Sequence, residues 1–328
     1  MADETARRRP VVGLALGSGS ARGWAHIGVI QALEALGVAP QVVVGTSIGA
    51  LVGAVYVSGH LEAFAGWIKT LTVRDVVGLM DFTLAGGMVK GNKLFGHIRE
   101  NYPDAGIETL PIRYASVATD MATGREHWIQ HGSVMRAARA SCALPGVFTP
   151  VESEGRWMLD GGLVNPVPVS TCRALGAEVV IAVNLNGELV GRHFSDDSRR
   201  EVERTATAAD AADVDGAATI EEATDEAEAG GVRSAGWWRR VRGYLGNSDA
   251  TLGRERAPGL FDVIATSVNI MQDRITRSRM AGDPPDVTLV PHLKDFALMD
   301  FHRAGEAIEE GHRLVAQQAD EIRYWAKL

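Results

Sequence analysis

The feature that most constrains the fold lies in the first fifty residues, where two short apolar segments are each followed by a small-residue loop. These segments are residues 11–16 and 42–44. A wholly apolar run bounded by turn residues is typical of a strand buried on both faces. Between them, residues 24–36 carry apolar side chains at helical spacing and end before Gly37. The pattern predicts a βαβ unit whose two loops open at the same end of a parallel sheet.

The second of these loops is the segment Gly45-Thr46-Ser47-Ile48-Gly49, followed by an apolar run that predicts a helix over residues 48–57. Glycines two positions before and after a serine suit a sharp strand-to-helix turn, because larger side chains would clash with the backbone there. The turn would place the Ser47 hydroxyl at a helix N-terminus, where free N–H groups favour a developing negative charge. Two interpretations of Ser47 stay open here: a nucleophile, or an ordinary serine in a βα loop.

The first loop contains Ser18, Gly19, Ser20, Ala21, Arg22 and Gly23. It lacks the G-x-G-x-x-G spacing of a dinucleotide site, because position 22 is arginine. Small residues let successive backbone N–H groups point into one concavity, which suits an oxyanion. Arg22 would brace this loop, meet an anionic head group, or form a structural ion pair.

A third motif, Asp160-Gly161-Gly162, follows the short apolar strand predicted at residues 157–160. An acid at the end of a strand, beside residues that let another backbone approach closely, is a candidate catalytic base. The same dipeptide is also common in simple turns. Asp160 is therefore either a base or a turn former on this evidence alone.

The remaining chain continues the α/β pattern. Residues 61–88 are rich in flexible apolar side chains and glycine, which fits either a cover over an apolar cleft or a plain pair of core helices. Residues 260–280 predict an amphipathic helix with an apolar stripe through Phe261, Ile264, Val268, Met271 and Ile275. Further strands are predicted at residues 112–118, 124–129, 179–183 and 286–290, and further helices at 134–140, up to 175, and 300–328.

Composition excludes several classes of protein. The chain has 328 residues, 46% of them hydrophobic, which predicts a globular protein, and its net charge of −8 argues against a nucleic-acid binder. Its two cysteines, Cys142 and Cys172, exclude a disulfide framework and a cysteine-based zinc cluster. No motif predicts a cofactor or a metal ion. So few cysteines fit a reducing cytoplasm, and we expect a cytoplasmic protein. No apolar run reaches the roughly twenty residues of a spanning helix. Residues 1–10 are predicted to be disordered.

Residues 187–258 interrupt the α/β pattern. Between positions 187 and 230 there are 13 acidic residues and 4 arginines, with few large apolar side chains, which predicts a disordered or loosely helical insert. Residues 232–246 then combine Trp237, Trp238 and several arginines. Such a segment suits peripheral contact with an anionic membrane, or a helix docked on the protein's own surface. Because strand and helix patterns resume afterwards, we predict one domain over residues 11–328 that contains this insert.

Together, loop 17–23, segment 45–49 and Asp160-Gly161-Gly162 resemble the motifs of the patatin-like phospholipases, most closely their bacterial RssA-like branch. The resemblance extends over residues 11–183 and 260–293, and residues 141–146 and 165–168 also match the family's pattern. It implies a three-layer α/β/α fold with a mostly parallel central sheet. It also implies an enzyme that hydrolyses lipid or phospholipid esters without a cofactor.

By this resemblance Ser47 is the nucleophile, and Asp160 is its proton acceptor in a dyad without histidine. Loop 18–23 matches the family's oxyanion-hole loop. It departs from the family at Ser18 and Ser20, where many members carry glycine, although backbone N–H donors survive that change.

Two alternatives belong to other classes. One is an α/β-hydrolase triad that uses His292, His302 or His312. The short interval between the two loops argues against this triad. Loop 17–23 precedes the first predicted helix, and the serine turn at residues 45–49 follows the second predicted strand. The other is a non-catalytic lipid-binding or adaptor protein that keeps the fold, with the acidic insert recruiting a partner.

Overall fold

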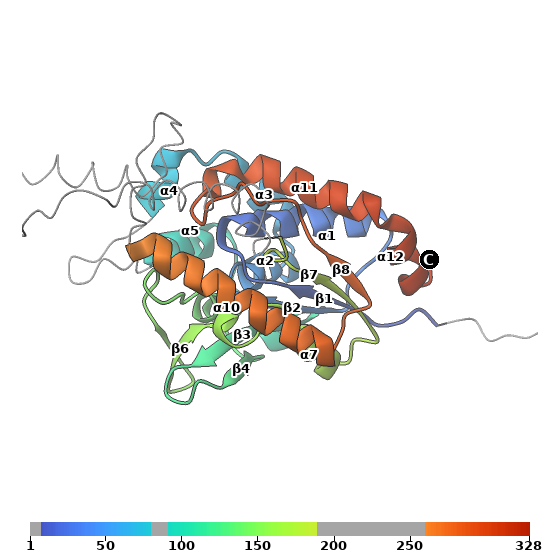
Figure 1. The fold of residues 1–328 in the computed structure, drawn as a ribbon, viewed down its shortest axis with the longest axis horizontal. Coiled ribbons are helices and arrows are strands. Elements are labelled where there is room, and N and C mark those ends of the chain that lie inside the picture. Colours follow the sequence, from blue (N-terminus) through green and yellow to red (C-terminus); the bar gives the residue numbers. More distant parts are fainter. Residues whose placement is uncertain (1–7, 80–90, 189–259) are drawn as a thin grey trace, which may run out of the picture. The chain divides into compact units, whose positions relative to one another are not determined.

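The computed structural model describes residues 8–79, 91–188 and 260–328 (Figure 1). Its centre is an eight-stranded sheet in the order β5-β6-β3-β2-β1-β7-β8, with β4 paired to β3. The strands are β1 (Val12–Leu16), β2 (Val42–Thr46), β3 (Arg113–Asp120), β4 (Glu126–Ile129), β5 (Val151–Ser153), β6 (Arg156–Asp160), β7 (Val179–Val183) and β8 (Val287–Leu289).

The helices are α1 (Ala25–Ala35), α2 (Ile48–Val57), α3 (Leu61–Lys69), α4 (Val73–Leu79), α5 (Asn92–Asn101), α6 (Val134–Ser141), α7 (Val169–Ala174), α10 (Leu260–Gly282), α11 (Ala304–Gln317) and α12 (Ala319–Ala326). Four short 3₁₀ helices accompany them: η1 (Ser20–Trp24), η2 (Ile107–Thr109), η3 (Gly161–Leu163) and η4 (Phe301–Arg303).

Strands β2, β1, β7 and β8 run parallel to one another, and β3 runs parallel to β2. Strands β4 and β6 pair with β3 in the antiparallel sense, and β5 pairs with β6 in the same way. Parallel pairing of β1 with β2 brings the loops after these two strands to one edge of the sheet. The predicted mostly parallel α/β sheet is therefore confirmed.

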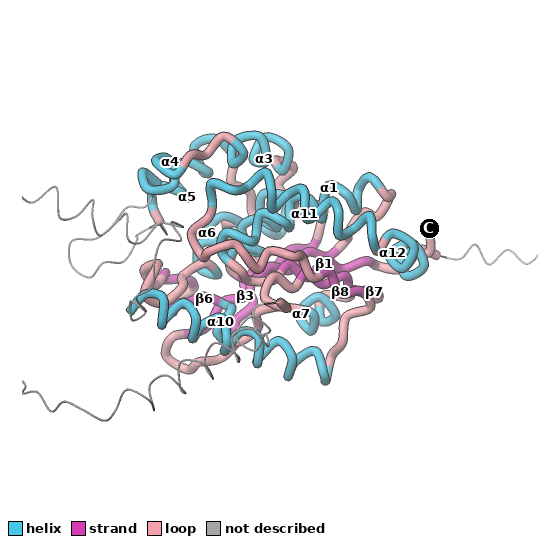
Figure 2. Tube along the Cα trace, turned by 45° about the horizontal axis from the view of Figure 1, so that its top comes forward, coloured by secondary structure: helices cyan, strands magenta, loops and turns pink. Residues whose placement is uncertain are grey.

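Helices cover both faces of the sheet (Figures 1 and 2). Along β1, Leu14 and Leu16 belong to a core cluster that includes α1, α2, α6 and α11. Ala15, between them, points to a second cluster formed with α7, against which Met280 of α10 also packs. This alternation explains why the strand is apolar at every position: each of its faces is buried under a different helical layer.

Several sequence predictions need correction. The loop after β1 is not open throughout, because residues 20–24 form η1 and α1 begins only at Ala25. The single closing helix predicted at 300–328 is divided into η4, α11 and α12, with a break at Gln318. Helix α5 and strand β5 were not predicted, since neither shows a continuous apolar period.

The predicted apolar stripe of α10 is also wrong in part. Met271 is 48% exposed, whereas Gln272, Asp273 and Thr276 are almost completely buried. The inward face of this helix is thus polar over its middle turns. An apolar period predicts burial only where the neighbouring layer is apolar, and here the neighbours are the polar loops at the sheet edge.

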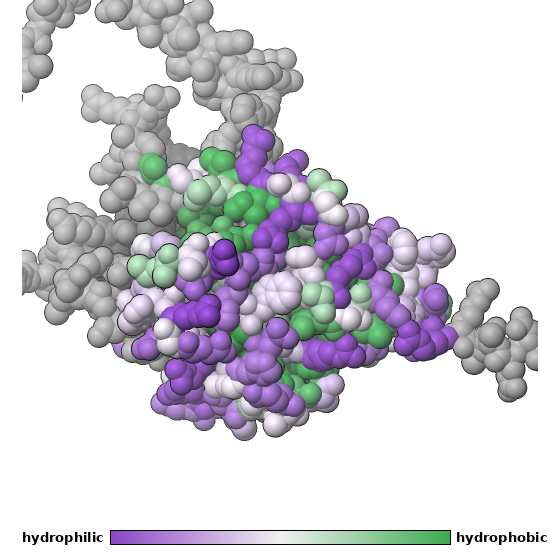
Figure 3. All heavy atoms as spheres, turned by 90° about the horizontal axis from the view of Figure 1, so that it is seen from below, coloured by the Kyte–Doolittle hydropathy of each residue, from purple (hydrophilic) through white to green (hydrophobic). Residues whose placement is uncertain are grey.

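Inter-residue contacts place the described residues in one compact unit. Apart from residues 187 and 188, the predicted acidic insert lies outside the described residues, as does the predicted membrane segment at 232–246, so both remain predictions. No helix in the described ranges combines the length and apolar character that crossing a membrane requires. On the face drawn in Figure 3, hydrophilic side chains cover most of the described surface, with smaller hydrophobic areas between them.

Candidate active site

Ser47 occupies a strained turn between β2 and α2. Its backbone has φ 58° and ψ −124°, a region that non-glycine residues rarely adopt. Close packing holds it there: a Cβ on Gly49 would lie 2.2 Å from the Leu16 carbonyl oxygen, and one on Gly45 would lie 2.3 Å from the Ala50 Cα. The two flanking glycines therefore let helix α2 sit directly on the strands, as the sequence motif predicted.

The side chain of Ser47 meets Asp160, although 113 residues separate them in sequence. The Ser47 hydroxyl donates a hydrogen bond of 2.5 Å to Asp160 Oδ2. The backbone N–H of Ser47 donates to Ser141 Oγ at 2.8 Å, and that hydroxyl in turn donates to the Val117 carbonyl. Ser141, at the end of α6, thus fixes the turn from the other side. The sequence marked residues 141–146 only through their match to a family pattern.

Asp160 ends strand β6 and is 1% exposed. Its second carboxylate oxygen, Oδ1, accepts the Gly162 N–H at 2.7 Å. Burial raises the pKa of this carboxyl from 3.8 to about 6, against the lowering effect of the bonds from Ser47 and Gly162. Gly161 allows the close approach of β3, since a Cβ there would lie 2.1 Å from the Val117 oxygen. The arrangement pairs a serine hydroxyl with a carboxylate able to accept its proton near neutral pH.

In the loop after β1, some backbone N–H groups donate hydrogen bonds to carbonyl groups of other segments. The Ser18 N–H donates to the Pro166 carbonyl at 2.9 Å, and the Ala21 N–H donates to the Leu298 carbonyl at 3.3 Å. Gly23 lies inside η1. Within the described residues, the N–H groups of Gly19 and Ser20 bond to no other group, and both residues line the same cavity as Ser47. Of the six residues predicted for an oxyanion hole, these two keep available donors at the cavity.

The two serines that depart from the family pattern each make a specific bond. Ser18 Oγ donates to Gln272 Oε1 at 3.0 Å, and Ser20 Oγ donates to the Leu298 carbonyl at 2.6 Å. Ser20 has φ 53°, a left-handed conformation that explains why glycine suits this position. The serine hydroxyls tie the loop to α10 and to the segment before η4.

Arg22 is 3% exposed and braces the loop from behind. Its Nε donates to the Gly19 carbonyl at 3.2 Å, and its guanidinium donates to Asn186 Oδ1 at 3.1 Å and Asn269 Oδ1 at 3.4 Å. This geometry supports the first of the three interpretations for Arg22. Arg22 is not among the residues that line the cavity around Ser47.

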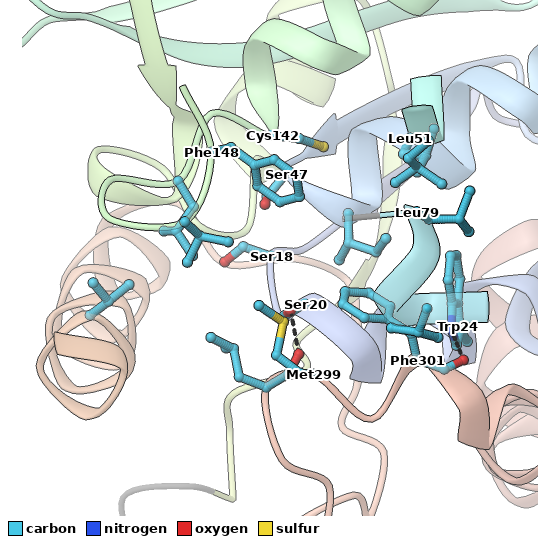
Figure 4. A pocket seen from close by; sticks show the side chains of 18 of the residues that line it. Ser18, Ser20, Trp24, Ser47, Leu51, Leu79, Cys142, Phe148, Met299 and Phe301 are labelled. Carbon is cyan, nitrogen blue, oxygen red and sulfur yellow. Dashed lines mark hydrogen bonds between the residues drawn. The ribbon is translucent and has the colours of Figure 1, made fainter. Parts of the chain in front are cut away.

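A cavity lies beside Ser47, which forms part of its wall (Figure 4). It encloses about 1030 Å³ of empty space, counting the part open to solvent. The polar part of its wall comes from Ser18, Ser20, Ser47, Asn269 and Gln272. The rest of the wall is mostly apolar and consists of Trp24, Ile48, Leu51, Leu71, Val76, Leu79, Leu94, Phe95, Leu144, Val147, Phe148, Val268, Leu298, Met299 and Phe301, with Gly19 and Cys142 completing it.

Both interpretations of residues 61–88 hold for different parts of that stretch. Phe64 and Ile68 of α3 are fully buried in the core cluster. Val76 and Leu79 of α4 line the cavity instead. Residues 80–90 lie outside the described ranges.

The histidines of the alternative triad lie elsewhere. His292 contacts Glu188, His312 contacts Gln31, and His302 is exposed in η4; none of the three lines the cavity. Both cysteines are free and buried. In the parts of the chain that the structure describes, no group of three or more side chains has the composition of a metal site.

A search of protein families matches residues 14–173 to the description "Patatin-like phospholipase". An uncharacterized NTE family protein of Mycobacterium bovis is 35% identical over 333 residues, covering 94% of this chain and 91% of the relative, and a protein of Mycobacterium tuberculosis matches equally well. The chain therefore belongs to the patatin-like phospholipase family, and with it to the carboxylic ester hydrolases.

Two eukaryotic relatives match a shorter part. The human patatin-like phospholipase domain-containing protein 6 is 34% identical over 185 residues, which is 54% of this chain and 13% of that protein. The Aspergillus fumigatus lysophospholipase nte1 is 34% identical over 182 residues, or 53% of this chain and 12% of the relative. Among solved structures, VipD from Legionella pneumophila has a TM-score of 0.50 at 13% identity, covering 95% of this chain and 67% of that one. This last likeness concerns the fold alone.

Proposed function

We propose that the protein hydrolyses carboxylic esters of lipids through an acyl-enzyme on Ser47, with Asp160 as the proton acceptor. The observation that carries the proposal is the 2.5 Å bond from the Ser47 hydroxyl to a buried carboxylate beside an apolar cavity. A lipid acyl chain fits such a cavity because its methylene groups gain free energy on leaving water.

The reaction follows from these groups. Ser47 Oγ attacks the ester carbonyl carbon while its proton passes to Asp160, and the Gly19 and Ser20 N–H groups stabilise the oxyanion. The tetrahedral intermediate collapses, and the leaving alcohol takes the proton from Asp160. A water molecule then attacks the carbonyl carbon of the acyl-enzyme and gives a proton to Asp160. The second tetrahedral intermediate releases the fatty acid as Asp160 returns that proton to Ser47 Oγ.

We further propose lysophospholipids as the substrate class. The name of the fungal relative, lysophospholipase nte1, supports this choice. A single chain also matches one cavity lined by apolar residues on several sides. No observation favours the non-catalytic adaptor, because such a protein has no need of a desolvated carboxylate bonded to a strained serine.

Replacement of the pair tests the proposal. Ser47→Ala should abolish ester hydrolysis, and Asp160→Asn should lower it by roughly 10²- to 10⁴-fold, with the double variant no worse than Ser47→Ala alone. A fluorophosphonate probe should label Ser47 in the native protein, as peptide mass spectrometry would reveal. Ser267→Ala, at an exposed position of α10, is the matched control and should leave both readouts unchanged. Near-normal turnover by Asp160→Asn would contradict the dyad.

A further inference from the structure

The polar wall of the cavity on the α10 side has an ordered set of amide groups. Asn269 and Gln272 lie one helical turn apart on α10, and both line the cavity that contains Ser47. Gln272 is 5% exposed, so its amide has left bulk water. A buried amide has two donor hydrogens and one acceptor oxygen to satisfy, and its orientation decides which of them faces the cavity.

The buried Arg22 fixes that orientation. A guanidinium only donates, so the Asn186 atom bonded to Arg22 at 3.1 Å must be its oxygen. Asn186 then presents Nδ2 to Gln272, at 2.9 Å, and the atom of Gln272 that accepts this bond must be Oε1. The hydroxyl of Ser18 donates to the same Oε1 at 3.0 Å. Oε1 of Gln272 therefore accepts both of these hydrogen bonds, and Nε2 is the amide group that takes part in neither.

The remaining amide nitrogen packs against Gly162, two residues after Asp160. A Cβ on Gly162 would be 2.4 Å from Gln272 Nε2 and 3.0 Å from Asp160 Oδ1, so the amide packs on the glycine that follows the Asp160-Gly161 pair. Nε2 bonds to none of the described residues and is not among the polar atoms sealed from solvent, and the Gln272 residue to which it belongs lines the cavity. The same logic applies to Asn269, whose Oδ1 accepts from Arg22 and whose Nδ2 is the remaining donor.

We propose that Gln272 is a specificity-determining residue whose Nε2 donates a hydrogen bond to an acceptor oxygen in the alcohol part of the lipid ester. This inference rests on the proposed ester hydrolysis and names the part of the substrate that the site recognises. Asn269 supplies a second donor at the same wall. The recognised chemistry is an oxygen acceptor, such as a glycerol hydroxyl or a phosphate oxygen.

The division of the cavity explains why the alcohol part lies there. The acyl chain takes the apolar walls formed by α4, α5 and the segment before η4. Ser47 and the loop after β1 contribute hydroxyl groups to the cavity wall, and Asn269 and Gln272 contribute the amide side chains. An ester bound at Ser47 with its chain among apolar groups leaves its oxygen-bearing part to the amide donors, because an unmatched donor costs free energy in a desolvated site.

The test compares esters with one acyl chain and three alcohols: ethyl laurate, monolauroylglycerol, and lauroyl lysophosphatidylcholine. Gln272→Glu keeps an acceptor oxygen for Ser18 and replaces the donor by a second acceptor. The kcat/KM ratio of the glycerol ester to the ethyl ester should fall about threefold to tenfold, the effect of one hydrogen bond. The corresponding ratio for the lysophospholipid should fall at least as far, because a carboxylate repels phosphate.

In the uncharged variant Gln272→Met, a fall of both ratios identifies a glycerol hydroxyl, which both substrates carry, as the acceptor. A fall confined to the lysophospholipid ratio in that variant identifies the phosphate. Unchanged ratios in both Gln272→Glu and Gln272→Met would overturn the inference while leaving the hydrolase proposal intact. A wild-type protein that cleaves none of the three esters would contradict the hydrolase proposal itself. Gln317→Glu, the same change at an exposed position of α11, is the control and should preserve every ratio. Thermal unfolding of each variant separates specificity from folding.

Discussion

Helices α10 and α11 flank the same sheet with opposite chemistry. Helix α11 packs against α1 through small and apolar residues, and the backbones come so close that a Cβ on Gly28 would lie 1.9 Å from the Ile308 oxygen. Helix α10 buries Gln272, Asp273 and Thr276. Apolar contact stabilises without regard to direction, whereas hydrogen bonds between amides require one orientation. The difference teaches that the α11 side stabilises the fold and the α10 side orients groups around the candidate active site.

Gly311→Ala should have the largest effect on stability. A Cβ at this position would lie 2.2 Å from the Ala25 oxygen, and neither backbone can move without displacing its helix. We expect a loss of about 3 kcal/mol, the upper range for overpacking, measured by chemical denaturation. Esterase activity per folded molecule should survive, because α11 supplies no residue to the cavity. A loss of esterase activity per folded molecule would contradict the assignment of stability to α11 and of group orientation to α10.

Asp160, at the end of β6, should control the dependence of activity on pH. Asp160 must be ionised to accept a proton, so kcat/KM should fall below a pKa of about 6, by roughly tenfold per pH unit, and level off above it. A pH-rate profile of the native protein measures this. A profile that is flat between pH 5 and pH 7 would exclude Asp160 as the base.

The same carboxyl should lower stability at neutral pH. Its pKa is raised from 3.8 in the unfolded chain to about 6 in the fold, so the folded state holds the proton more tightly. The protonated carboxyl therefore contributes stability that is fully present below pH 3.8 and is lost as the pH rises through 6. Asp160→Asn should therefore remove a pH-dependent cost of at most about 3 kcal/mol, which urea denaturation at pH 4 and pH 7 would detect.

Thr276→Val should stabilise the protein modestly. The Thr276 hydroxyl is buried on α10 and has no hydrogen-bond partner in the part of the chain described. Replacing it by a methyl group of similar shape should raise the unfolding free energy by about 1 kcal/mol. A destabilisation of similar size would indicate that a water molecule bonds to the hydroxyl. The buried Thr276 hydroxyl would then not lower the free energy of unfolding.

Gly305→Ala should give the smallest effect, with a sign opposite to that of Gly311→Ala. Gly305 lies in the same helix, but a Cβ there would meet no atom within 4 Å. The gain in helix propensity should raise stability by about 0.5 kcal/mol. The pair of substitutions compares one residue type at two positions of α11, so a loss at both would attribute the Gly311 effect to the helix rather than to its contact with α1.

The sequence alone identified the elements whose formation depends on adjacent residues. Apolar runs bounded by small residues predicted β1, β2 and β7, because strands buried on both faces are apolar at every position. The Gly45 and Gly49 pair marked the turn at Ser47, since only glycine permits such close packing of helix on strand. Family resemblance added Asp160 as its partner.

Only the tertiary structure decided which donors and acceptors face the cavity. Ser18 and Gln272 are separated by 254 residues, and Arg22 and Asn186 by 164, so no local pattern relates them. The apolar period of α10 was wrong at Met271, which is exposed, because burial at the middle turns of this helix depends on polar loops from distant parts of the chain. Hydrogen-bond direction is a property of the assembled neighbours, whereas strand and turn formation depends on adjacent residues.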